Sequence, residues 1–177
     1  SWGLHVAIAI GDSSAGSGAH RIVRLALTGN DRPGIVRDLS GRLAGRGVSI
    51  QWLNLSAAQK TLINRRLQYL ARPENARYRY DYYTSNCATK VRDVLDDALG
   101  GMLGKRLSAS SLGNTYRSES VRLAWPAKWM ALGFDLGMSG NGDKPLSKWQ
   151  DAFIPMLLQR SLGEISLPDG RPLVAGT

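Results

Sequence analysis

A tyrosine-rich stretch that runs straight into a helix constrains this 177-residue chain most. Tyr78, Tyr80 and Tyr82 alternate with other residues, which predicts a strand over 77–83 with three rings on one face. These rings either pack in the core with their hydroxyls bonded or form the wall of a substrate cleft. A helix over 87–99 follows at once, so the two elements must meet close to their junction.

The only cysteine of the chain stands where this helix begins. Asn86 or Ser85 can cap the helix, which places Cys87 in the first turn. Unpaired backbone N–H groups and the helix dipole favour a thiolate there, and Lys90 and Arg92 add positive charge. Cys87 is therefore either a nucleophile or a buried structural cysteine.

The helix that follows is amphipathic and has a clear end. Apolar residues at helical spacing share a face with Cys87, so we expect its thiol to look toward packed protein or into a cleft. They are Val91, Val94, Leu95 and Ala98. The pair Gly100-Gly101 ends the helix.

Composition excludes several kinds of site. One cysteine cannot form an intrachain disulfide or a cysteine-rich metal site, and the two isolated histidines, His5 and His20, do not suggest a zinc cluster, so no metal or cofactor is expected. No run of about 18 apolar residues is present to span a bilayer. The chain opens at Ser1 without Met or a basic leader, so we expect that a signal peptide is absent or was removed, or that the chain is a fragment.

The net charge of +9 favours anionic partners. We find no nucleic-acid-binding motif, so nucleic acid is not expected as a partner, whereas an anionic membrane surface fits the charge. Trp125, Trp129 and Met130, grouped around Pro126, either contact lipid or pack in the core. The sequence leaves the oligomeric state open.

The first segment, residues 1–52, contains strand patterns and a linker rich in glycine and serine. We expect strands near 4–10, 20–28 and 48–54, a tether over 11–19 and a helix over 34–46, since apolar residues recur there every four positions. The last two strands and the helix form a β-α-β unit. Asn30-Asp-Arg-Pro-Gly-Ile-Val36 and Leu43-Ala-Gly-Arg-Gly-Val-Ser-Ile50 resemble the opening half of an ACT domain, a small amino-acid-sensing module.

That resemblance implies an alternative function. ACT domains hold an amino acid on backbone N–H groups at the junction of strand and helix, which corresponds here to Asn30, Asp31, Gly34 and Ile35. In this alternative the chain is an amino-acid-binding regulatory module without catalysis, and the remainder supports it.

The second segment, residues 53–177, is richer in helix patterns. Ser56-Ala-Ala-Gln59 is a capping box that opens a helix over 57–70. Another helix is expected over Lys148 to Leu162, followed by a turn-rich tail. The fold class is therefore α+β, with a small mixed sheet and helices packed on it.

A second resemblance covers about residues 53–165. The motifs resemble the periplasmic domain of Lnb-type lipoprotein N-acyltransferases, and the Asn86-Cys87 pair at the helix start is the sharpest of them. The others are Asn54-Leu-Ser-Ala-Ala-Gln59, Arg72-Pro-Glu-Asn75, Tyr78-Arg-Tyr-Asp-Tyr-Tyr83, Val91-Arg-Asp93, Thr115-Tyr-Arg117, Gly133-Phe-Asp-Leu-Gly137, Asp143-Lys-Pro145, Trp149 and Phe153-Ile-Pro155.

This resemblance implies a papain-like core, similar to NlpC and lecithin:retinol acyltransferase enzymes, in the periplasm of the bacterial envelope. It implies cysteine-dependent acyl transfer or hydrolysis on a lipid or lipoprotein substrate. Cys87 would be the nucleophile, His20 the base and Asn86 the third site residue. The family's Gly-His motif is missing, and His20, which opens a strand, is the better substitute of the two histidines. The chain is thus either an active enzyme or a degenerate relative.

Overall fold

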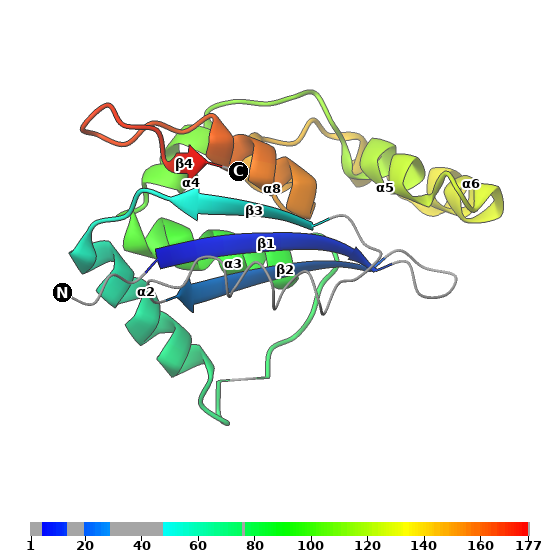
Figure 1. The fold of residues 1–177 in the computed structure, drawn as a ribbon. Coiled ribbons are helices and arrows are strands. Elements are labelled where there is room, and N and C mark those ends of the chain that lie inside the picture. Colours follow the sequence, from blue (N-terminus) through cyan, green and yellow to red (C-terminus); the bar gives the residue numbers. More distant parts are fainter. Residues whose placement is uncertain (1–4, 14–19, 29–47, 76, 177) are drawn as a thin grey trace.

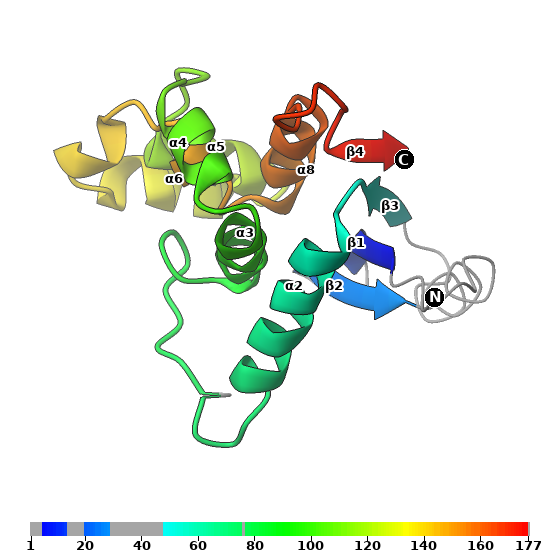
Figure 2. The ribbon, with the colours of Figure 1, turned by 90° about the vertical axis from the view of Figure 1, so that its left-hand side faces the viewer.

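A computed structural model describes residues 5–13, 20–28, 48–75 and 77–176 (Figure 1). Its described strands form one four-stranded antiparallel sheet in the order β2-β1-β3-β4. Figure 2 shows α2, α3 and α8 on one face of this sheet. The strands are β1 (His5–Ser13), β2 (His20–Thr28), β3 (Val48–Leu53) and β4 (Val174–Gly176).

The three strands predicted in the first segment are confirmed, but their arrangement differs from a mixed sheet. Both β2 and β3 pair antiparallel with β1, which lies between them, so the prediction of a mixed sheet is wrong. β1 also extends through Gly11 to Ser13, residues that the sequence assigned to the linker. The predicted helix over 34–46 lies outside the described residues. The division at residue 52 falls inside β3, and the two-segment organisation stays a prediction.

Helices make up most of the second segment, in agreement with an α+β class. Two of them, predicted over 57–70 and 87–99, are confirmed within one residue. The described helices are α2 (Ala57–Leu70), α3 (Cys87–Ala98), α4 (Met102–Ser108), α5 (Tyr116–Ala124), α6 (Lys128–Gly137), the 3-10 helix η1 (Gly140–Asp143), α7 (Lys148–Asp151) and α8 (Pro155–Gly163).

Local signals explain most helix ends. Ser56 and Gln59 form the predicted capping box of α2. Gly100 and Gly101, with φ of 66° and 79°, end α3 in a left-handed conformation that other residues rarely adopt. The single helix predicted over 148–162 is instead two helices, because Pro155 lacks an N–H group and disfavours helical backbone at the residue before it.

The strand predicted over 77–83 is absent, which is the main error of the sequence interpretation. Asp81 Oδ1 accepts hydrogen bonds from the N–H groups of Tyr83 and Thr84 and from the Thr84 hydroxyl. These bonds close a turn, and only an isolated bridge joins Asp81 to Ser85. Tyr78, Tyr80 and Tyr82 are exposed as a result, so the prediction that they pack in the core is wrong.

The core lies between the sheet and the helices, and α3 is at its centre. Leu95 of α3, Ile63 of α2 and Leu158 of α8 are fully buried in one cluster. A second, smaller cluster gathers Phe153 and the partly buried Tyr83 beneath α5. This second cluster connects the loop before α3 to the helices that follow it.

Candidate functional site

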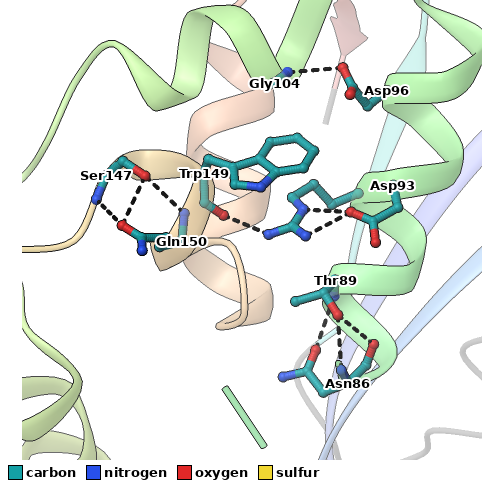
Figure 3. A network of polar contacts seen from close by, with 9 residues as sticks. Asn86, Thr89, Asp93, Asp96, Gly104, Ser147, Trp149 and Gln150 are labelled. Carbon is teal, nitrogen blue, oxygen red and sulfur yellow. Dashed lines mark hydrogen bonds and ion pairs between the residues drawn. The ribbon is translucent and has the colours of Figure 1, made fainter. Parts of the chain in front are cut away.

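The start of α3 is fixed by the side chain of Asn86, which is the N-cap of the two candidates that the sequence offered, Asn86 and Ser85. Its Oδ1 accepts a hydrogen bond from the Thr89 N–H at 3.0 Å, and the Thr89 hydroxyl accepts one from the Asn86 N–H at 2.9 Å. Figure 3 shows this reciprocal pair at the first turn of the helix. Asn86 and Thr89 are both buried, so the cap is shielded from water.

The amide of Asn86 also joins the helix start to a distant part of the chain. Its Nδ2 donates to the carbonyl oxygen of Tyr82 at 2.8 Å and to that of Phe153 at 2.9 Å. All the polar atoms of this side chain are therefore engaged in holding the backbone around Cys87. The predicted catalytic role of Asn86 stays a prediction, and its observed contacts are those of a residue that positions the cysteine.

Cys87 is exposed at the first position of α3. The prediction that its thiol looks toward packed protein is wrong, although Val91, Val94 and Leu95 on the same face are buried. In the described residues, the segment before the helix closes a turn in which Asp81 is bridged to Ser85. The alternative of a buried structural cysteine is excluded.

Two tyrosines and a lysine lie near the thiol. Partial burial raises the pKa of Tyr78 and of Tyr80, and negative charge on the nearby Cys87 sulfur raises each pKa further. The Lys90 ammonium lies 4.9 Å from the centre of the Tyr78 ring, a cation–π contact. The two phenols therefore lie within electrostatic range of the exposed thiol, and Lys90 lies over one of them.

Arg92 does not add charge beside the thiol, contrary to the sequence interpretation. Its side chain is buried, its Cζ lies 3.8 Å from the centre of the Trp149 ring, and its Nη1 donates to the Trp149 carbonyl oxygen at 2.7 Å. Its Nε and Nη2 both donate to Asp93. Arg92 therefore serves to hold α7 against α3.

The first two backbone N–H groups of α3 are available as hydrogen-bond donors. Among the described residues, the N–H groups of Cys87 and Ala88 have no hydrogen-bond acceptor, whereas those of Thr89 and Lys90 bond to Asn86. Unsatisfied N–H groups of this kind carry the positive end of the helix dipole. They could stabilise negative charge that develops on a carbonyl oxygen attacked by Cys87.

The strands place the two histidines at opposite ends of the sheet. His20 opens β2 opposite Ser13, while His5 opens β1 opposite Thr28, the last residue of β2. Their backbones are therefore about 26 Å apart along the strands, at ~3.3 Å per residue. β2 contacts α3, and Figure 1 shows both running in the same direction from the same end of the molecule. Of the two histidines, His20 is therefore the one whose strand begins at the end of the molecule where α3 begins.

Two features of the site cannot be predicted from the sequence. Phe153 anchors Asn86 across 67 positions, and no local pattern signals that bond. Asp151 in α7 is fully buried, with Oδ2 accepting from Asn114 at 3.2 Å and Oδ1 without a partner in the described residues. Desolvation raises the pKa of its carboxyl to about 6. Its position among apolar residues could have been noticed, but not its burial.

A comparison with sequence models of protein families identifies the family of the chain. The sequence model of the Lnb N-terminal periplasmic domain matches residues 34–123, which include the capped helix and Cys87. The chain belongs to this family. No curated protein and no solved structure matches it.

Membership in the Lnb N-terminal periplasmic domain family indicates a protein of the periplasm and the cell envelope. The matched region begins at residue 34, before the predicted start at 53, and ends at 123 rather than 165. It therefore includes Gly34 and Ile35 of the ACT-like segment, and the ACT resemblance is not confirmed. The four residues predicted to bind an amino acid lie outside the described residues; they are Asn30, Asp31, Gly34 and Ile35. Their role in binding an amino acid remains a prediction. The papain-like core also remains a prediction.

Two findings on membranes and metals concern the described residues only. No helix there is both long and apolar enough to cross a bilayer. No three or more metal-ligating side chains gather there either. Neither finding bears on the parts of the chain outside those ranges.

Proposed function

We propose that this Lnb-family domain carries out cysteine-dependent acyl transfer or hydrolysis on a lipid or lipoprotein of the bacterial envelope, with Cys87 as nucleophile. The observation that carries this proposal is an exposed thiol on a rigidly capped helix start with two free backbone N–H groups beside it. The family match adds the envelope setting.

The chemistry follows from these groups. The Cys87 thiol loses its proton to a base, and the sulfur attacks the carbonyl carbon of an acyl ester. The C–O bond breaks, the alcohol leaves with a proton, and the acyl group remains on sulfur as a thioester. An amine then takes the acyl group to form an amide, or water takes it to form a carboxylic acid, and the thiol is restored.

His20 is the residue that we assign as the base, because β2 begins at the end of the molecule where α3 begins. Neutral imidazole accepts the thiol proton and returns it to the leaving alcohol. Asn86 keeps Cys87 at the first helical position through its bonds to Thr89, Tyr82 and Phe153. The N–H groups of Cys87 and Ala88 supply the oxyanion site.

The test is the covalent intermediate. The protein is incubated with a p-nitrophenyl ester of a medium-chain fatty acid, and its intact mass is measured after acid quenching. We expect one acyl group on Cys87, released by neutral hydroxylamine as thioesters are. Cys87→Ser should not form the thioester, and His20→Ala should slow its formation at least ~100-fold, the usual contribution of a general base.

His5→Ala is the matched control, because it removes the other imidazole at the opposite end of β1. Its acylation rate should equal that of the unmodified protein. If no acyl adduct forms on Cys87, or if iodoacetamide labels it no faster than a free cysteine across pH 5–9, the proposal fails and the domain is a scaffold.

A further inference from the structure

The hairpin of α5 and α6, which we call the arm, presents an apolar surface outward. Figure 1 shows the arm projecting from the body at the end where α3 begins. On α6, Trp129, Leu132 and Leu136 have the i, i+3, i+7 spacing of one helical stripe and are 74%, 57% and 77% exposed. Ala131, on the other side, is buried. The apolar side of this helix therefore faces away from the protein.

Trp125, the residue that caps the end of α5, is another large apolar side chain of the arm and is 62% exposed. The alternative that Trp125, Trp129 and Met130 pack in the core is therefore wrong. Leaving such large apolar side chains in water is unfavourable relative to burying them. Several large exposed apolar side chains on one helical hairpin point to an interaction surface.

From this arrangement we infer that the arm docks on the surface of an anionic lipid bilayer. Tryptophan is enriched at membrane interfaces, where an apolar ring and a polar N–H are both accommodated. Lys128 starts α6, is exposed and forms no ion pair with the described part of the chain, so it can meet lipid phosphates. The net charge of +9 attracts the domain to anionic headgroups over longer distances.

The alternative of a second copy of the chain fits the arm less well. A stable protein interface buries about 800 Å² on each partner and uses about 20–30 residues. The apolar surface here consists of a few side chains on a narrow projection. Shallow insertion into headgroups, about 5–10 Å deep, requires no larger surface.

The root of the arm is tied to the loop that leads into Cys87. The Tyr83 hydroxyl and Ser120 Oγ share a hydrogen bond of 2.8 Å, and the rings of Tyr83, Tyr116 and Phe153 pack together. Docking of the arm would therefore orient the start of α3 relative to the bilayer. This inference deepens the proposed function by naming how a lipid substrate is approached.

Vesicle binding tests the inference without any catalysis. The Cys87→Ser protein is mixed with sedimentable vesicles of phosphatidylglycerol and phosphatidylcholine, or of phosphatidylcholine alone, and bound protein is measured after centrifugation. We expect binding to the anionic vesicles, weaker binding to the neutral ones, and a loss of at least ~100-fold in affinity for Trp129→Ser with Leu136→Ser.

The matched control is Leu62→Ser with Tyr69→Ser, which removes a leucine and an aromatic residue, 49% and 46% exposed, from α2. It should bind vesicles as the parent protein does. Equal binding by the arm variant, or no binding by the parent, overturns the inference. A dimer in sedimentation equilibrium that dissociates in the arm variant, with no vesicle binding, assigns the surface to a second copy and also overturns it. Because Cys87 is absent throughout, none of these results depends on acyl transfer.

Discussion

Replacement of Asn86 by alanine should cost far more stability than removal of an ordinary helix cap. The side chain makes three hydrogen bonds that alanine cannot make, namely the cap to the Thr89 N–H and the donations to the carbonyl oxygens of Tyr82 and Phe153. A lost cap costs about 1 kcal/mol. Each lost donation costs about 1 kcal/mol more where the acceptor is shielded from water. The sum is about 3 kcal/mol.

Ser56→Ala provides the comparison, because Ser56 forms the same capping box at an exposed helix start with no tertiary bond. It should lower the free energy of unfolding by about 1 kcal/mol or less. Asn86→Asp keeps the cap but sets a carboxylate against two carbonyl oxygens, so it should be no more stable than Asn86→Ala. Urea titrations followed by circular dichroism at 222 nm give all three values.

Equal losses for Asn86→Ala and Ser56→Ala would refute the reasoning, because the two amide donations would then contribute nothing. If the loss is as large as calculated, the start of α3 should also fray. The rate at which iodoacetamide alkylates Cys87 at fixed pH should then differ from that of the parent protein and approach that of a free cysteine.

Two further predictions concern buried charge. Asp151→Asn should change how stability depends on pH: in the parent the folded pKa of about 6 lies above the ordinary value of 3.8, so the carboxyl costs nothing well below pH 3.8, progressively more between pH 3.8 and pH 6, and a constant amount at higher pH. The free energy of unfolding of Asp151→Asn minus that of the parent should therefore rise by about 2 kcal/mol between pH 4 and pH 7, and a difference that stays constant over that range would contradict the assignment. Arg92→Met should lower the free energy of unfolding by about 2–4 kcal/mol, since the Trp149 carbonyl loses its donor and the ring loses its cation. Arg66→Met, which breaks the exposed pair with Asp97, should cost less than about 1 kcal/mol, and similar losses for the two variants in thermal or urea unfolding would count against the buried role of Arg92.

The candidate site could be predicted from the sequence only in its local part. The cap at Asn86, the helix that starts at Cys87 and its end at Gly100-Gly101 all depend on residues within a few positions of one another. The alternating tyrosines predict a strand, but the Asp81 carboxylate accepts hydrogen bonds from the N–H groups of Tyr83 and Thr84 and closes a turn instead. The burial of Arg92 against Trp149 joins residues 57 positions apart, which no local pattern reports.

The sequence by itself determined where α2 and α3 begin and that a single thiol stands at a helix start. Those features follow from backbone hydrogen bonding and side-chain spacing over one or two turns. Only the tertiary structure decided that the thiol is exposed, that Phe153 holds its cap, that β1 separates β2 from β3, and that the apolar side of α6 faces outward. Each of these depends on which distant segments exclude water from one another, and the same residues in a different packing would give a different answer.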